Sequence, residues 1–245
     1  GNVTKEEMKL LKAHNVSLGL MLESTSERLF EKGMAHEFAP SKKPNERLEV
    51  IKNAGRMKIP ITTGLLIGIG ETNEEIINDL FLLKQINNEF GNIQEIILQN
   101  FQPKVKTRMQ NYPSPTKEYY LKIVSLARLI MPKMNIQIPP NLSPGYYGRF
   151  LDAGINDWGG ISPITIDHVN PEFSWSKINE LKNMIVPPIY SLLQKLKQGK
   201  IGKEKAEALY RFLTNLDIPQ KIDALRNRCE EEGKLQEARE HEQVW

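Results

Sequence analysis

Apolar positions in the first two-thirds of the chain alternate between helical spacing and short continuous runs. The continuous runs predict strands over residues 16–22, 59–67, 93–100 and 136–141, with a short fifth strand over 157–161. Helical spacing predicts helices that begin near residues 5, 45, 73 and 115, of which the second is expected to end at Gly55 and the last at Pro132.

Paired hydroxyl and carboxylate residues mark expected helix starts. A Ser or Thr followed three residues later by Glu can satisfy two backbone N–H groups at a helix N-terminus. The pattern occurs at Thr4 with Glu7, at Ser24 with Glu27 and at Thr72 with Glu75.

Strands separated by helices predict parallel βαβ units and an α/β fold. Polar residues recur where the predicted strands end, namely Glu23-Ser24, Glu71, Gln99-Asn100, Asn141 and Asp157. In a (β/α) barrel those ends form the catalytic face. A flavodoxin-like sheet has the same alternation, and periodicity leaves the two folds open.

The sequence changes character near Pro187. Residues 195–243 are rich in Lys, Glu, Ala, Leu and Arg and predict two or more solvated helices with a break at Ile218-Pro219. Ser176 is expected to cap a helix just before this tail. We therefore expect two regions, residues 1–186 and 187–245, with the tail favoured as a helical appendage over a binding element.

Composition and charge limit the partners and the cellular location that we expect for the protein. The net charge is +3, and because its signs are interspersed, nucleic acid is not expected as the main partner. No apolar run reaches the roughly 18 residues of a membrane span, and the polar N-terminus predicts no secretion signal. A cytoplasmic location is expected. The start Gly-Asn-Val, without Met, is expected to be the edge of a fragment.

Metal-binding residues are sparse. A single cysteine, Cys229, excludes an intramolecular disulfide and predicts that this chain alone holds no iron–sulfur cluster. The four histidines lack the close spacing of a metal site and are expected to be surface or hydrogen-bonding residues.

The most informative stretch runs from Gly64 to Glu71, Gly-Leu-Leu-Ile-Gly-Ile-Gly-Glu. Asn73 stands where a dinucleotide fingerprint needs its third glycine, and no Gly-Lys-Ser/Thr follows, so neither nucleotide motif fits. Taken alone, a glycine-rich turn is structural at least as often as it is functional.

This stretch resembles the adenine-contacting strand of radical S-adenosylmethionine (SAM) enzymes, whose pattern is Gly-x-Ile-x-Gly-x-x-Glu. The match requires that the isoleucine of the pattern be allowed one position later, at Ile67. Further blocks resemble the deazaflavin-forming members of that family, which make the precursor of coenzyme F420. They are Gly19–Ser24, His36–Lys42, Ile59–Glu71, Ile93–Phe101, Gln137–Leu142 and Ala153–Pro163. The likeness covers residues 5–186 and implies the C-terminal part of a radical SAM barrel, about five of its eight strands, followed by the helical tail.

The resemblance implies that the family's Cys-x-x-x-Cys-x-x-Cys motif, which holds a [4Fe-4S] cluster, lies upstream of the residues seen here. It also implies roles in SAM binding for four residues. Glu23 would meet the SAM ammonium, and Arg47 its carboxylate, while Gly68 and Glu71 would lie beside the adenosine. The alternatives are a helix-capping acid for Glu23 and a solvated helix charge for Arg47.

A second set of residues is expected to bind the substrate. Gln99, Asn100, Gln137 and Asn141 carry amides that donate and accept together, which suits a uracil-like ring. Asp157 and Trp158 add a carboxylate and an aromatic face. For any single one of these, a structural role at the barrel rim is an equal alternative. In one block the family's Lys-Pro-Gly-Thr-x-Met reads Lys104-Val-Lys-Thr-Arg-Met, so the turn at Lys106 is expected to differ.

The activity that the resemblance implies is closure of the deazaflavin ring with loss of ammonia. The substrate would be an adduct of tyrosine and 5-amino-6-(D-ribitylamino)uracil, made by a second synthase subunit, and a SAM-derived radical would abstract hydrogen from it. This chain alone is expected to be inactive. The alternatives are another radical SAM enzyme, of the partner-subunit or menaquinone-pathway type, and a non-catalytic truncated barrel that acts as a binding protein.

Overall fold

The computed structural model describes residues 2–162, 165–175, 189–199, 201–215 and 218–231. It divides into two compact units, Gly1–Trp175 and Ser176–Trp245, which are described separately. The boundary expected between residues 186 and 187 and the helix expected after Ser176 both lie outside the described residues.

The first unit contains a four-stranded parallel sheet. Its strands are β1 (Leu18–Gly19), β2 (Ile61–Ile67), β3 (Ile93–Asn100) and β4 (Ile136–Gln137), in the spatial order β1-β2-β3-β4. Each strand therefore lies beside its neighbour in sequence, as in a barrel. A flavodoxin-like sheet reverses direction and places its second strand outside the first. The strand order decides the question that periodicity left open.

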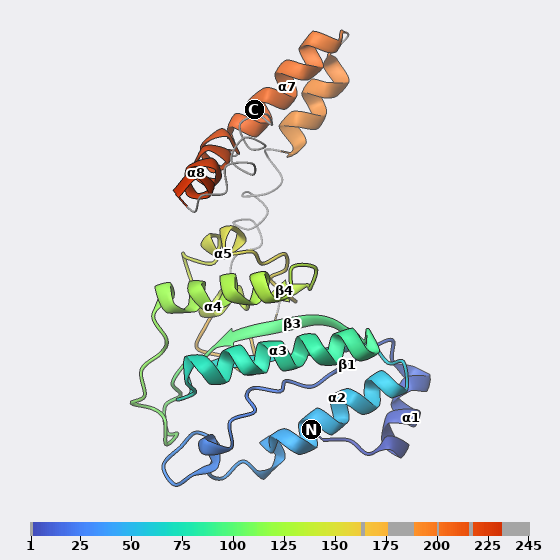
Figure 1. The fold of residues 1–245 in the computed structure, drawn as a ribbon, viewed down its shortest axis with the longest axis vertical. Coiled ribbons are helices and arrows are strands. Elements are labelled where there is room, and N and C mark those ends of the chain that lie inside the picture. Colours follow the sequence, from blue (N-terminus) through green and yellow to red (C-terminus); the bar gives the residue numbers. More distant parts are fainter. Residues whose placement is uncertain (1, 163–164, 176–188, 200, 216–217, 232–245) are drawn as a thin grey trace. The chain divides into compact units, whose positions relative to one another are not determined.

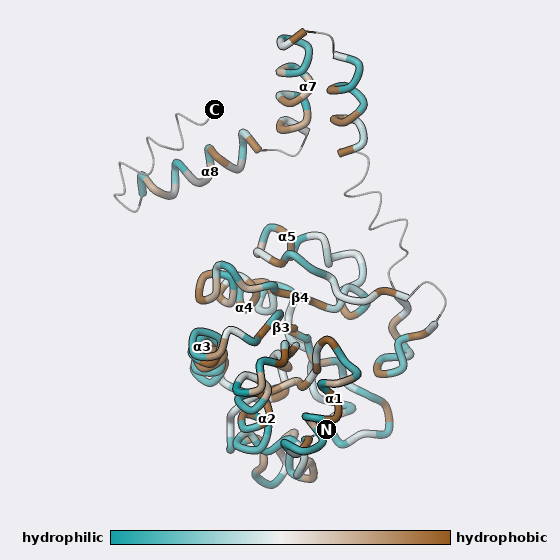
Figure 2. Tube along the Cα trace, turned by 90° about the vertical axis from the view of Figure 1, so that its right-hand side faces the viewer, coloured by the Kyte–Doolittle hydropathy of each residue, from teal (hydrophilic) through white to brown (hydrophobic). Residues whose placement is uncertain are grey.

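Helices α2, α3 and α4 lie side by side against the sheet (Figures 1 and 2). The helices of this unit are α1 (Lys5–His14), α2 (Pro44–Arg56), α3 (Asn73–Phe90), α4 (Lys117–Ile130) and the short α5 (Arg149–Asp152). Their apolar stripes pack on alternate strand residues, so that Leu80, Val124 and Ile96 are completely buried. This layer of helices covers one face of the sheet, and none of these three helices lies on the opposite face.

Two of the three predicted capping boxes are confirmed. Thr4 with Glu7 and Thr72 with Glu75 exchange both capping hydrogen bonds at the starts of α1 and α3. The prediction at Ser24 is wrong. The element there is a short 3-10 helix, Glu27–Phe30, which Ser26 precedes without a side-chain cap. The Ser24 hydroxyl instead accepts a hydrogen bond from the Ser26 N–H.

Several strands are shorter than predicted. The first is only Leu18–Gly19, with a separate pairing of Glu23 to Leu65. The fourth ends at Gln137 and gives way to a 3-10 turn at Pro140–Leu142, because consecutive prolines supply no N–H to extend a ladder. The predicted fifth strand is a single bridge between Gln137 and Asp157.

Gly55 does not end its helix. It lies in the last turn of α2, which continues through Arg56. A Cβ added at Gly55 would lie 2.5 Å from Cγ of Phe90, at the end of α3. Gly55 therefore permits close packing of two helices. The left-handed residue that does end a helix is Gly91, after α3, with φ of 64°.

The second unit is helical where it is described. Residues 189–198 are helical, followed by α7 (Gly202–Asn215) and α8 (Ile218–Glu231), whose start coincides with the predicted break at Ile218-Pro219. Cys229 is buried within α8. None of the helices in the described parts of the chain is long and apolar enough to cross a membrane.

Candidate functional site

Glu23 lies just beyond β1 with its backbone held in the sheet. Its N–H donates to the Gly64 carbonyl, and its own carbonyl accepts from the Leu66 N–H. Its φ of 67° is left-handed, a conformation that costs a non-glycine residue free energy and persists only where the surroundings enforce it.

The Glu23 side chain is only 11% exposed and is surrounded by basic groups. The Lys42 ammonium contacts one carboxylate oxygen, and Nη1 of Arg47 lies 3.5 Å from that same oxygen. Nε2 of His36 lies 3.1 Å from the other and donates, because an ionised carboxylate can only accept. Burial raises the pKa of Glu23, but these bonds and charges outweigh it and hold the pKa below its usual range. The carboxylate caps no helix.

Arg47, in the first turn of α2, is a buried residue with its side chain only 6% exposed. Its guanidinium donates to the carbonyls of Met21 and, at 3.1 Å, Ser41. Burial lowers its pKa, partly offset by the charge of Glu23. The solvated-charge alternative is therefore wrong, since the structure brings Arg47 to Glu23.

Gly68 and Glu71 form a tight turn after β2. The Glu71 carboxylate folds back and accepts from the N–H groups of Gly68 at 2.5 Å and Ile69 at 2.7 Å. Burial raises the pKa of Glu71, and these backbone hydrogen bonds limit the rise. Gly68 has φ of 95°, and a Cβ there would lie 2.7 Å from Cδ of Pro115. Glu71 therefore stabilises the turn in which it lies.

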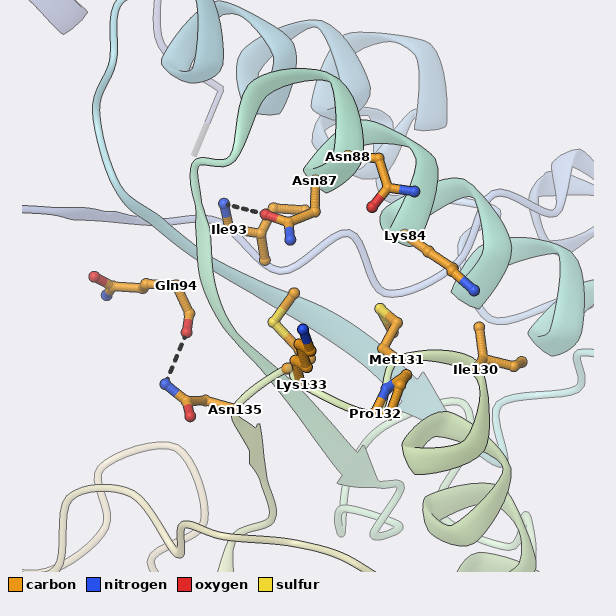
Figure 3. Close-up of a pocket in the computed structure, with 11 residues that line it drawn as sticks. Lys84, Asn87, Asn88, Ile93, Gln94, Ile130, Met131, Pro132, Lys133 and Asn135 are labelled. Atoms are coloured by element: carbon orange, nitrogen blue, oxygen red, sulfur yellow. Dashed lines mark hydrogen bonds between the residues drawn. The ribbon is translucent and has the colours of Figure 1, made fainter.

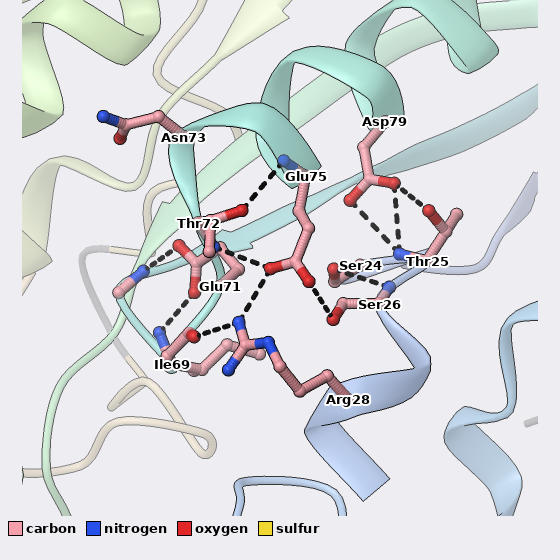
Figure 4. A network of polar contacts seen from close by, with 12 residues as sticks. Ser24, Thr25, Ser26, Arg28, Ile69, Glu71, Thr72, Asn73, Glu75 and Asp79 are labelled. Atoms are coloured by element: carbon pink, nitrogen blue, oxygen red, sulfur yellow. Dashed lines mark hydrogen bonds and ion pairs between the residues drawn. The ribbon is translucent and has the colours of Figure 1, made fainter.

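A polar network joins this turn to the segment after Glu23 (Figure 4). Arg28 donates to the Gly70 carbonyl at 2.7 Å and to Glu75 at 2.8 Å. Glu75 also accepts from the Ser26 hydroxyl at 2.6 Å, in addition to its capping bond. Burial raises the pKa of Glu75, but the bonds from Arg28, Ser26 and the Thr72 N–H lower it to about 2.

Asp79 of α3 makes the second attachment of that segment. Its carboxylate accepts from the backbone N–H of Thr25 at 3.1 Å and from the Thr25 hydroxyl. Burial raises its pKa, which these hydrogen bonds partly oppose. Sequence reasoning did not single out Asp79. The available signal was a carboxylate on the apolar face that carries Ile76, Leu80 and Leu83.

The expected substrate residues divide between the two faces of the sheet. Ile96 and Leu98 are buried under the helices, so by alternation Gln99 lies on the face opposite α2, α3 and α4. Gln137 is in register with Ile97 and lies on that same face. Both are half-buried. Glu23 lies at the same edge of the sheet, because its backbone pairs with Leu65 of β2, which is the neighbour of β3.

Asn100 and Asn141 are buried. The Asn100 amide donates to the Leu142 carbonyl at 3.0 Å, and the Asn141 amide to Asp167 at 2.8 Å. The Oδ1 atoms of both have no hydrogen-bond partner among the described residues. Each side chain thus holds a loop through its amide N–H group, while its amide oxygen accepts no hydrogen bond from the described residues.

Asp157 and Trp158 lie beside Gln137. Asp157 is exposed, and its carboxylate accepts from the Gly159 N–H at 2.7 Å in a local turn. Trp158 packs edge-on against Tyr147 with ring centroids 6.0 Å apart, and its Nε1 is buried with no partner among the described residues.

Lys106 adopts φ of 61°, the left-handed conformation that glycine takes without cost. The backbone at this position thus keeps a glycine-compatible conformation although the residue is lysine. Nearby, Arg108 pairs with Glu37 at 2.8 Å and lies over the ring of Phe38, so this loop contacts the segment that carries His36 and Lys42.

A pocket of about 270 Å³ lies elsewhere, where β3 and β4 begin (Figure 3). Lys84, Asn87 and Met131 are among its lining residues. In a barrel this edge supports stability, while chemistry is found at the opposite edge. The candidate site is therefore the edge that carries Glu23, Gly68 and Gln99.

The basic and acidic groups around Glu23 suit a zwitterion, with a carboxylate for an ammonium group and cations for a carboxylate. They do not suit an iron–sulfur cluster, which needs thiolates. No group of three His, Cys, Asp or Glu residues that could hold a metal was found in the described ranges.

Solved structures share this fold. The [FeFe]-hydrogenase maturase HydG from Carboxydothermus hydrogenoformans matches with a TM-score of 0.62 and 16% identity, over 89% of this chain and 57% of that one. Methylornithine synthase (PylB) matches with a TM-score of 0.54 and 19% identity, over 64% and 44%. No family model matches the chain. The fold and its strand order define part of a parallel (β/α) barrel.

Relatives of known name are similar to the chain at higher sequence identity. A 7,8-didemethyl-8-hydroxy-5-deazariboflavin synthase of Methanocaldococcus jannaschii is 52% identical over 182 residues, 74% of this chain and 51% of the relative. An FO synthase of Mycobacterium tuberculosis is 48% identical over 199 residues, 80% of this chain and 23% of the relative. The chain is a homologue of part of the 7,8-didemethyl-8-hydroxy-5-deazariboflavin (FO) synthases and spans about half the length of the first.

The Glu75 network predicts a stability change that depends on pH. Because the pKa of folded Glu75 lies near 2, below the usual 4.5, its contribution is present above pH 4.5 and is lost as pH falls toward 2. Glu75→Gln should lower the unfolding free energy by about 1 kcal/mol at pH 7. Urea unfolding at pH 7, 5 and 3 should show the difference from wild type shrinking.

Glu74→Gln is the matched control, because Glu74 is exposed in the same first turn. An equal loss of stability in both variants, or a difference that stays constant down to pH 3, would contradict this role for Glu75.

Proposed function

We propose that this chain forms the C-terminal part of an FO synthase, which closes the deazaflavin ring of a tyrosine–ribityldiaminouracil adduct with loss of ammonia. The observation that carries the proposal is the match to FO synthases at about 50% identity, in a chain whose strand ends present a zwitterion-compatible site. The reaction class is a radical SAM lyase, and a second synthase subunit would supply the adduct.

SAM would be held by four residues of this chain. Glu23 would accept a hydrogen bond from the ammonium group of SAM. Arg47 would orient toward the carboxylate of SAM, because hydrogen bonds to the Met21 and Ser41 carbonyls already hold its guanidinium in place. The turn at Gly68 would lie beside the adenosine, and Glu71 sets the shape of that turn by accepting from the Gly68 and Ile69 N–H groups. In this class SAM supplies the radical that abstracts hydrogen from the substrate.

The adduct would lie against the face of the sheet opposite α2, α3 and α4. Gln99 and Gln137 offer amides there, and Asp157 and Trp158 flank Gln137. Asn100 and Asn141 enter through their buried, unused amide oxygens, each able to accept from a ring N–H. Polar amides at the ends of adjacent strands are typical of a heterocycle site at that edge of the sheet.

The alternative of a non-catalytic binding barrel lacks a comparable observation. Glu23 keeps a left-handed backbone and a buried charge, both of which cost stability, and such features concentrate at functional sites.

Glu23→Gln should weaken SAM binding roughly tenfold or more in a complete synthase that contains this segment, because a charge-assisted contact is lost. Calorimetric titration with SAM measures this directly. Glu27→Gln serves as control, since Glu27 is exposed four residues away. Equal SAM affinity in the two variants would remove Glu23 from the site.

Substitution of the proposed substrate residues should separate two activities. Gln99→Ala, Asn100→Ala and Asn141→Ala should each slow FO formation while SAM cleavage without substrate stays nearly unchanged. Chromatography of FO and of 5′-deoxyadenosine measures the two. A parallel fall in both activities would instead assign these residues to the barrel's structure.

The 245-residue chain by itself should be inactive and should assemble no [4Fe-4S] cluster. Its only thiol is Cys229, which is buried in α8, and added iron and sulfide cannot replace missing ligands. Anaerobic reconstitution followed by electron paramagnetic resonance under reducing conditions tests this. A stoichiometric cluster signal with reductive SAM cleavage would refute it.

A further inference from the structure

The three basic groups around Glu23 are not equivalent. Arg47 is buried and committed to two backbone carbonyls as well as to Glu23. His36 is also buried, and its ring packs on Phe30 with centroids 5.3 Å apart. Neither side chain can leave without breaking other contacts, so both belong to the fixed wall of the site.

Lys42 is different. Its side chain is 31% exposed, and its ammonium makes no other hydrogen bond or ion pair among those found for the described residues. It stands at the end of a short 3-10 turn, Pro40–Lys42, on a flexible four-carbon stem. Of the three, only Lys42 can withdraw toward solvent at the cost of one contact.

The chemistry of that contact matches the ligand. Lys42 places a primary ammonium against the carboxylate that, in the proposed function, receives the primary ammonium of SAM. A buried carboxylate left with one contact fewer is costly, so an empty site is better kept with a cation in place. A ligand ammonium and the Lys42 ammonium cannot both occupy the same position.

We infer that Lys42 is a resident substitute for the ligand's ammonium group and is displaced from Glu23 when SAM binds. This inference rests on the proposed function of Glu23. Lys42 would then act as a positioning residue that also selects the ligand, because only a ligand with an ammonium group can replace the lysine at Glu23. Neutral analogues of SAM leave the Glu23–Lys42 pair closed.

The test compares affinities for decarboxylated SAM, which keeps a primary ammonium and lacks the carboxylate that a released lysine could contact. In a complete synthase containing this segment, Lys42→Met should bind this analogue roughly fivefold more tightly than wild type, because no ion pair is broken on binding. Lys42→Gln should change in the same direction. Thermal melting first establishes that both variants are folded.

Lys43→Met is the matched control. It removes the same charge one residue away, at an exposed side chain, and should change the affinity by less than about twofold. In a Glu23→Gln background, Lys42→Met should have no effect, because the carboxylate for which the two ammonium groups compete is gone.

The outcomes separate the two proposals. Equal gains in Lys42→Met and Lys43→Met, or no gain in Lys42→Met while wild type binds SAM, would overturn the exchange and leave the proposed function intact. Failure of decarboxylated SAM to bind both wild type and Lys42→Met, while SAM binds, also counts against the exchange. Failure of SAM to bind wild type at all would overturn both.

Discussion

The buried charge of Glu23 is the constraint on which the site depends. A carboxylate that is 11% exposed needs donors and cations around it, and those found among the described residues come from one segment of the chain. His36, Lys42 and Arg47 follow Glu23 within twenty-four residues, so pairing the charge folds that segment back over the end of the sheet. The same geometry that satisfies the carboxylate also creates a site with both signs of charge.

Helix α3 fixes that segment from the other side. Its first turn holds Ser26 and Arg28 through Glu75, and its second turn holds Thr25 through Asp79. Because Arg28 also reaches the Gly70 carbonyl, the turn after β2 and the segment after β1 are held in one polar network. The residues proposed for the ammonium and the adenosine of SAM are thus linked through α3.

The sequence predicted the regular elements better than the site. Helical spacing and Thr-Glu pairs located α1 and α3, because capping depends on four consecutive residues. Ser24 carried the same pattern but folded differently, since Glu23 and Thr25 on either side of it are held by tertiary contacts. Periodicity could not separate a barrel from a flavodoxin-like sheet, because strand order is a property of pairing between strands.

The contacts of the site were less accessible still. Glu23 and Arg47 were proposed from the resemblance, but their proximity and the partners His36 and Lys42 depend on how a loop returns to the sheet. Asp79 could have been noticed as a charge on an apolar helix face, although nothing local identifies Thr25 as its partner. Local patterns constrain elements, while buried charges are paired by residues distant in the chain.

The strand order has a consequence for how such a protein is made. Each strand pairs with the one that precedes it in the chain, so every βαβ unit can dock as soon as it has been synthesised. Sheet formation then advances in the direction of translation, and no strand must wait for a distant one to be inserted between its neighbours. If such a barrel is divided between two neighbouring strands, only the pairing between those two strands is lost, and each part keeps its other pairings. The connection between two strands is therefore the natural place to join or separate parts of the barrel.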